Sequence, residues 1–350
     1  MSKKIDKTAP IMVTGGTGYL ASWIIKQLLD KGLNVRATVR NKANTEKNKH
    51  LIKLGDEGKG SLELYEADLL QEGSFDQAMS NCEVVFHTAS PFQIFGIKDP
   101  QKELVDPALK GTKNILASVN KTQTVKRVIL TSSVASISQD AIETVNKKLN
   151  EETWNTTSSL KNNPYSFSKK LAEETAWQIA NSQDRWDLIV INPGFILGPS
   201  LSSRIDSFSI DFMLSMLNGK NKKGVPALAF PLVDVRDVAK AQILGAFTQN
   251  ASGRHIVVSG KSLFYLEIAE IIKNEYGDRY PTPTKNVPNF ILYILAPFLK
   301  MKWSFLKNNL GIRSELDNSY SKKDLGMTYK SIEETIIDHV QQIINDGLVK

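Results

Sequence analysis

Cysteine is almost absent from this chain, which contains only Cys82 in 350 residues. A single cysteine cannot close an internal disulfide bond, and such scarcity is typical of a reducing compartment. Residues 1–9 are polar and lack the apolar core of a secretion signal. We therefore expect a cytoplasmic protein.

Patterns for metal binding and for several enzyme classes are also missing. The four histidines (50, 87, 255 and 339) are dispersed, and without a second cysteine they form no metal-ligand spacing. No Gly-x-Ser-x-Gly sequence is present for a serine hydrolase. Residues 260–262 resemble the end of a phosphate-binding loop, but His255 occupies the position where that motif needs glycine. We expect neither a metal nor an NTPase site.

Charge and hydrophobicity argue against a nucleic-acid partner and against a membrane-spanning segment. The formal net charge is +7, but the lysines are interleaved with acids and form no dense run beside aromatic residues, so we expect no nucleic-acid partner. The apolar stretch at residues 290–299 is too short to span a bilayer, and Pro297 interrupts it. We expect a buried helix beside a pocket there, with contact to a membrane surface as the alternative, and no stable membrane insertion.

The order of apolar segments predicts the fold. Strand-like runs alternate with helical segments from Ile11 to Ile191, which predicts a doubly wound α/β fold: a parallel sheet with helices on both faces. The expected strands are residues 11–13, 34–40, 62–66, 84–88, 128–132 and 188–191. The expected helices are residues 19–31, 74–79, 101–120 and 164–181, and residues 41–60 are expected to form a charged loop.

This alternation ends near Phe195. One more strand is expected at residues 254–259, and the remainder is mostly helical in pattern. We expect a Rossmann domain made of residues 1–194 and 229–260. Residues 195–228 and 261–350 would form a smaller, mostly helical C-terminal cap that shapes a substrate pocket.

The stretch at residues 10–22 carries the first functional motif. An apolar run leads into Gly15, Gly16 and Gly18, and a helical pattern follows. Strand, glycine turn and helix are the context of a dinucleotide-binding fingerprint. Gly15 would make the tight turn, and Gly18 would let the backbone approach a pyrophosphate at the helix N-terminus. A plain structural turn is the alternative.

The second motif lies on the helix expected at residues 164–181. Tyr165 and Lys169 are four residues apart and therefore share one helix face. A lysine ammonium beside a phenol favours the phenolate, so we expect Lys169 to lower the pKa of Tyr165. Ser133 follows an expected strand and would hydrogen-bond the same carbonyl oxygen that Tyr165 protonates.

Together these motifs resemble the extended short-chain dehydrogenase/reductase family, near the dihydroflavonol reductase and cinnamoyl-CoA reductase group, which also includes aldehyde reductases. The resemblance covers residues 10–260. It rests on the sequences at residues 13–22, 35–40, 67–69, 73–76, 85–91, 130–133, 165–173, 192–199 and 234–239.

The resemblance implies roles for individual residues. Tyr165 would be the general acid, Lys169 its partner and a ribose ligand, Ser133 the orienting hydroxyl, and Asn114 would hold a proton-relay water. The implied cofactor-binding residues are Gly15, Thr17, Gly18, Tyr19, Leu20, Arg36, Arg40, Lys47, Asp68, Leu69, Thr88, Ala89, Ser90, Tyr165, Lys169 and Pro193. The expected substrate pocket contains Ser90, Phe92, Ser133 and Phe195.

The charged residues near the end of the second expected strand distinguish an NAD site from an NADP site. An NAD site needs a carboxylate near the end of the second strand, but this chain has Arg36 and Arg40 there and no acid. A guanidinium suits a phosphate, so we expect NADP(H), with Arg40 as the better candidate and Lys47 as a second cation.

The expected activity is NADPH-dependent reduction of an aldehyde or ketone to an alcohol. Ser138 stands where flavonoid reductases carry asparagine, and residues 163–169 lack the longer aromatic signature that cinnamoyl-CoA reductases carry around the catalytic tyrosine. Neither named substrate class is therefore supported, and a carbonyl compound with a hydrophobic or aromatic body is expected. A nucleotide-sugar epimerase or dehydratase and a non-enzymatic NADP(H) sensor remain alternatives. We expect a monomer or homodimer.

Overall fold

A seven-stranded, all-parallel sheet forms the centre of the computed structural model, which describes residues 3–90, 97–298 and 301–349. The strand order is β10-β6-β5-β4-β1-β2-β3. The expectation of a doubly wound α/β fold is confirmed. The strands are β1 (Ile11–Val13), β2 (Val35–Val39), β3 (Leu62–Glu66), β4 (Val84–His87), β5 (Arg127–Thr131), β6 (Asp187–Pro193) and β10 (Gly253–Val257).

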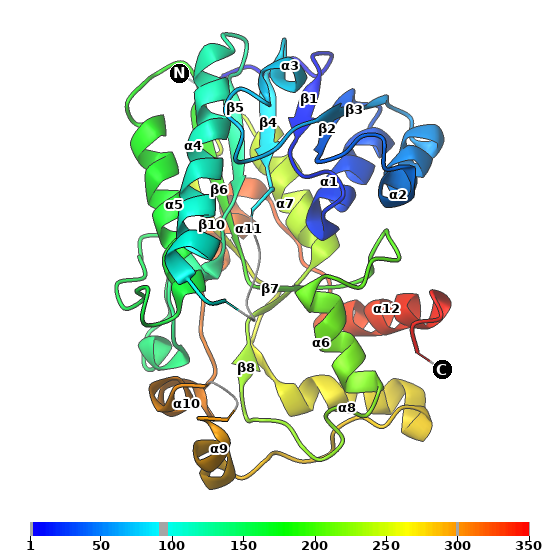
Figure 1. The fold of residues 1–350 in the computed structure, drawn as a ribbon, viewed down its shortest axis with the longest axis vertical. Helices are drawn as coiled ribbons and strands as arrows, with labels where there is room; N and C mark the ends of the chain where they lie inside the picture. Colours follow the sequence, from blue (N-terminus) through cyan, green and yellow to red (C-terminus); the bar gives the residue numbers. More distant parts are fainter. Residues whose placement is uncertain (1–2, 91–96, 299–300, 350) are drawn as a thin grey trace.

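Helices cover both faces of this sheet (Figure 1). One face packs against α1 (Tyr19–Asp30), α2 (Thr45–Glu57) and α7 (Val235–Phe247). The other packs against α3 (Asp76–Met79), α4 (Asp106–Lys121) and α5 (Pro164–Ala180). A π-helical turn, η1 (Gln101–Val105), leads into α4. Two separate apolar cores result, one on each side of the sheet.

The helix α2 corrects the expectation of a charged loop at residues 41–60. Asn44 caps it by accepting a hydrogen bond from the backbone nitrogen of Lys47 at 3.0 Å. Leu51 is fully buried against the sheet core, and Leu54 is partly buried there. This segment has few apolar and many charged residues, so its composition alone predicts a surface loop.

The cap has its own apolar core. It contains the strand pairs β7 (Phe195–Leu197) with β9 (Leu232–Asp234), and β8 (Ala229–Phe230) with β11 (Leu263–Phe264). Its helices are α6 (Phe208–Leu217), α8 (Tyr265–Tyr276), α9 (Asn289–Leu295), α10 (Trp303–Asn309) and α12 (Ile332–Asn345), with the short turn η4 (Gly277–Arg279). Two further short turns, η2 (Val134–Ser136) and η3 (Ala141–Thr144), follow β5 in the sheet domain. Near the end of the chain, α11 (Ser319–Leu325) lies within the expected cap, and Leu325 and Met327 belong to the apolar core of the sheet.

The expectation of a buried helix at residues 290–299 is wrong. On α9, Leu292 is 5% exposed, but Phe290 and Ile294 are 65% and 64% exposed. Only one stripe of this short helix packs against the rest of the chain. Within the described residues, no helix is both long enough and apolar enough to cross a membrane.

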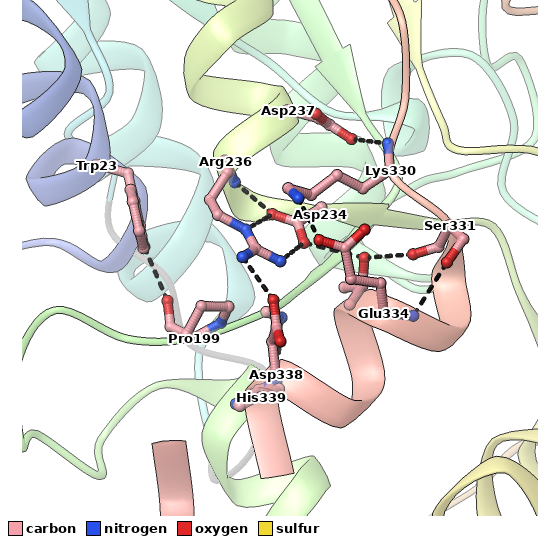
Figure 2. Close-up of polar contacts among 12 residues, drawn as sticks. Trp23, Pro199, Asp234, Arg236, Asp237, Lys330, Ser331, Glu334, Asp338 and His339 are labelled. Carbon is pink, nitrogen blue, oxygen red and sulfur yellow. Dashed lines mark hydrogen bonds and ion pairs between the residues drawn. The ribbon is translucent and has the colours of Figure 1, made fainter. Parts of the chain in front are cut away.

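A charge cluster fastens α12 to the first residues of α7 (Figure 2). The carboxylate of Asp234 is fully buried, caps α7 and accepts a hydrogen bond from Thr335 of α12 at 2.9 Å. Arg236 bridges Asp234 to Asp338 of α12, with contacts of 2.6 Å to each. Nearby, Trp23 of α1 donates a hydrogen bond to the carbonyl oxygen of Pro199. The cap is thereby held against the sheet domain.

We predict that Asp234→Ala destabilises the protein by about 3 kcal/mol, because it leaves a partly buried guanidinium without its main partner. Asp338→Ala is the matched control. Its carboxylate is 39% exposed, and its loss should cost less than about 1 kcal/mol. Urea unfolding followed by circular dichroism measures both. Equal losses from the two variants would contradict a central role for Asp234.

Candidate active site

The site lies where the strand order reverses, at the carboxyl ends of β1 and β4. Gly15 has φ +65°, and a Cβ there would lie 3.0 Å from the Cβ of Ala89. The hydroxyl of Thr14 accepts hydrogen bonds from the backbone nitrogens of Thr88 and Ala89, both at 3.0 Å. The loops after the two strands are thus fixed against each other.

The N-terminus of α1 opens onto this edge. Gly18 is its N-cap and supplies no side-chain partner to the first backbone N–H groups. Such groups at the start of a 12-residue helix bind phosphate readily. The close turn at Gly15 and the uncapped helix therefore fit the pyrophosphate of a dinucleotide, which agrees with the expectation from the sequence.

The basic side chains expected at the N-terminus of α1 differ in position and in their contacts. Arg40 follows β2, is exposed, and forms no ion pair with any described residue. Lys47 is exposed on the first turn of α2. Arg36, at the start of β2, instead donates to the carbonyl oxygen of Ser80 at 2.6 Å and lies over the ring of Tyr65. Arg36 therefore has no part in the candidate cofactor site, because it lies at the far end of the strand.

One cation near this turn was missed. Arg204, in the segment before α6, donates to the carbonyl oxygen of Thr17 at 3.3 Å and pairs with Asp206. No motif in the sequence marks Arg204, because it approaches the glycine turn from the cap, far away along the chain.

The loop after β3 is also held in place from a distance. Asn114 on α4 donates to the carbonyl oxygen of Leu69 at 2.7 Å. Its amide nitrogen is thus bound to the Asp68–Leu69 segment. The expectation from the sequence was that Asn114 holds a proton-relay water. Asn114 positions this loop.

Ser133, Tyr165 and Lys169 meet beside the carboxyl end of β5. The hydroxyl of Ser133 lies near enough to that of Tyr165 to act on its pKa, and it accepts a hydrogen bond from the backbone nitrogen of Ala135 at 3.1 Å. The amine of Lys169 donates to the hydroxyl of Ser90 at 3.1 Å. Asn163, in the left-handed region at φ 55°, caps α5 through Ser166 and so fixes where this helix begins. The three expected side chains are therefore brought together by β5, α5 and the loop after β4.

Burial dominates the proton affinities here. It raises the pKa of Tyr165 to about 12, although the neighbouring hydroxyl of Ser133 acts in the opposite direction. This is contrary to our expectation that Lys169 lowers the pKa of Tyr165. Burial also lowers the pKa of Lys169 to about 8, while the negative charge of Glu173 raises it. In this structure the tyrosine is consequently a protonated phenol at neutral pH.

Glu173 is a further residue that the sequence analysis did not assign. Its fully buried carboxylate accepts hydrogen bonds from Ser136 at 2.6 Å and Asn192 at 2.9 Å, and also from Ser132. It pairs with Arg254 of β10 at 2.5 Å. Glu173 lies one turn beyond Lys169 on α5, so this buried network fixes the helix that carries Tyr165 and Lys169.

A cavity of about 210 Å³ opens beside these groups. Its lining includes Val134 and Ser166, the chain neighbours of Ser133 and Tyr165, together with Phe230 and Phe305 from the cap. Ser133, which was expected in the substrate pocket, is not itself among the lining residues. Phe195 is not among the lining residues. It supports the cavity wall by packing on Phe230, with ring centroids 5.6 Å apart.

Three other residues that the sequence linked to the substrate, Ser138, Ser90 and Phe92, differ in where they lie relative to the cavity. Ser138 lines the cavity. Ser90 contacts Lys169 instead. Phe92 lies outside the described residues.

Fold and site together define a dinucleotide-binding α/β protein of the oxidoreductase type. The model of the NAD dependent epimerase/dehydratase family matches residues 11–259, and the chain belongs to this family of extended short-chain dehydrogenases/reductases. The resemblance stated from the sequence is confirmed.

Individual relatives narrow the group. The chain is 41% identical over 269 residues to cinnamoyl-CoA reductase CAD2 of Medicago truncatula, covering 76% of this chain and 80% of the relative. It is 34% identical to tetraketide alpha-pyrone reductase 1 of Arabidopsis thaliana, covering 96% of each chain. The structure of Gre2 from Candida albicans in complex with NADPH is similar, with a TM-score of 0.78 and 31% identity, covering 96% of this chain and 99% of that one.

We predict that Lys169 titrates near pH 8 and that Glu173→Gln lowers its pKa, because the variant removes a negative charge that favours the ammonium. Competitive acetylation across pH, read by mass spectrometry, measures this pKa. Glu174→Gln is the control, since Glu174 pairs with Lys170. An unchanged Lys169 titration in folded Glu173→Gln protein would contradict the assigned coupling.

Proposed function

We propose that this protein reduces an aldehyde or ketone to an alcohol with NADPH, and that Tyr165 donates the proton. The observation that carries the proposal is the proximity of the Ser133 and Tyr165 hydroxyls, close enough for Ser133 to lower the pKa of the phenol, beside a cavity of about 210 Å³. Two hydroxyls at one point can hold one carbonyl oxygen. The reductases among the relatives support the reaction class.

The side chains divide the chemistry between them. The bound cofactor supplies the hydride to the carbonyl carbon. Ser133 donates a hydrogen bond to the carbonyl oxygen and orients it. Tyr165 holds its proton until negative charge develops on that oxygen, which suits a phenol with a raised pKa. The ammonium of Lys169 then stabilises the phenolate that remains.

NADP(H) is the proposed cofactor. Arg40 and Lys47 are exposed beside the dinucleotide edge, and Arg40 has no ion-pair partner among the described residues. A guanidinium in that position suits the 2′-phosphate. The similar Gre2 structure was solved with NADPH, which supports the assignment. Backbone groups of Thr17, Leu20, Thr88, Ala89 and Pro193 complete the proposed contacts.

The cavity favours a substrate with an apolar body. Phe230, Phe305 and Leu316 supply apolar surface, whereas Ser138 and Gln139 supply polar groups. A mainly apolar wall with few polar groups suits a hydrophobic or aromatic carbonyl compound. The missing carboxylate after β2 argues against an epimerase that retains NAD, and the intact pair Tyr165 and Lys169 argues against a sensor without activity.

We predict that Tyr165→Phe lowers kcat for carbonyl reduction by at least a hundredfold and leaves NADPH affinity close to wild type, because general acid catalysis contributes about that much or more. A panel of aldehydes and ketones assayed by loss of NADPH absorbance gives the rate, and calorimetry gives the affinity. Retention of more than a tenth of the turnover, with chemistry rate-limiting, would exclude the proton-donor role.

We predict that Arg40→Ala weakens NADPH binding by roughly ten- to a hundredfold, because a charge-assisted contact contributes ~1.5–3 kcal/mol. NADH lacks the 2′-phosphate and should lose little. The kcat/KM values for the two cofactors should therefore converge. Arg36→Ala is the control, because Arg36 is bound to the carbonyl oxygen of Ser80. Equal weakening of both cofactors by Arg40→Ala would refute the assignment.

A further inference from the structure

Helices α9 and α10 form a small hairpin with its own apolar core. Leu292, Ala296 and Leu306 are buried between the two helices. The hairpin lies at the end of the molecule away from the edge strand β3 (Figure 1). These buried residues account for the packing of the two helices against each other. The apolar side chains that the hairpin exposes therefore need a different explanation.

Several large apolar side chains of this hairpin are exposed. Phe290 and Ile294 are one helical turn apart and share a face of α9. Phe298 is 82% exposed, and Trp303 at the start of α10 is 62% exposed. Such a concentration of exposed aromatic and aliphatic groups marks an interaction surface. Phenylalanine and tryptophan are the residues that enter the interface of a lipid bilayer.

The charged residues of the segment that forms this hairpin have one sign, although Asp140 from η3 accepts hydrogen bonds from Asn308 and Asn309 of α10. Residues 279–314 contain no aspartate or glutamate but six basic residues, in a chain whose formal net charge is +7: Arg279, Lys285, Lys300, Lys302, Lys307 and Arg313. Lys285, Lys302 and Lys307 are exposed and form no ion pair with a described residue. A region of this composition attracts an anionic surface.

The positive charge of the hairpin also indicates which partner binds its exposed apolar surface. A second copy of the chain would bring two such positive regions together, and like charges facing each other oppose association. An anionic bilayer satisfies both features at once, because it accepts the apolar side chains and neutralises the lysines.

The hairpin also forms part of the cavity wall. Phe305 and Asn309 of α10 line the cavity, while Trp303 on the same helix is exposed. A surface held at a bilayer by α9 and α10 therefore places the cavity close to the lipid.

We propose that the α9–α10 hairpin docks reversibly on anionic membrane surfaces through Phe290, Ile294, Phe298 and Trp303, with the neighbouring lysines binding lipid headgroups. The docking is peripheral, consistent with helices too short to span a bilayer among the described residues.

Sedimentation of the full chain with phosphatidylcholine vesicles, with and without phosphatidylserine, tests the proposal. Binding should require phosphatidylserine and weaken as salt is raised. Each basic residue at such a surface strengthens binding roughly fivefold, so Lys302→Gln/Lys307→Gln should bind about 25-fold more weakly. Phe290→Ser/Ile294→Ser should also lose binding. Both variants should keep the wild-type thermal unfolding midpoint, because the altered side chains are exposed.

Matched controls come from the opposite end of the chain. Ile52→Ser and Lys59→Gln alter exposed residues of the same types and should bind vesicles like wild type. Absence of wild-type binding to phosphatidylserine vesicles at low salt would overturn the proposal, as would equal binding by the hairpin variants. Concentration-dependent dimerisation that Phe290→Ser/Ile294→Ser abolishes, without vesicle binding, would assign the surface to a second copy.

Discussion

The buried carboxylate of Glu173 joins the parts of the chain that form the active site. It is bonded to Arg254 of β10, to Asn192 of β6, and to Ser132 and Ser136 after β5. A buried charge without partners destabilises a fold by several kcal/mol, so these groups and Glu173 depend on one another. The ends of three strands and one helix are consequently held in a single arrangement.

The geometry of the proposed chemistry follows from this network. Tyr165 and Lys169 lie on the two turns of α5 that precede Glu173, so anchoring Glu173 sets where both side chains lie relative to Ser133. Burial at this point raises the pKa of Tyr165 and lowers that of Lys169. The same exclusion of water that makes Glu173 depend on its partners therefore determines which proton Tyr165 and Lys169 hold.

The cap is attached by different means. Its core is separate from those of the sheet, and buried Asp234 connects it to the sheet domain through Arg236 and Thr335. Its outermost part, the α9–α10 hairpin, has a core of its own and leaves Phe290 exposed. A pocket between separately packed units can differ in shape among relatives while the dinucleotide edge stays the same. This division is consistent with relatives named for different substrates.

The sequence alone determined those features that depend on local spacing. Alternating apolar runs specified the parallel sheet, and the turn at Gly15 and Gly18 specified the dinucleotide edge, because each is a property of a few consecutive residues. The four-residue spacing of Tyr165 and Lys169 likewise placed them on one helix face. The charged composition of α2 led to the incorrect prediction of a loop there, since Leu51 is the one apolar residue of this helix that is fully buried.

Tertiary structure decided everything that depends on distant partners. The sequence left both Arg36 and Arg40 as candidate phosphate ligands, with Arg40 preferred, and only packing shows that Arg36 is bound to the carbonyl oxygen of Ser80. Glu173 has no local motif that reveals its link to Arg254, a residue on another strand. The raised pKa of Tyr165 reversed the local expectation because burial is a property of the whole fold, whereas the neighbouring lysine is visible in the sequence.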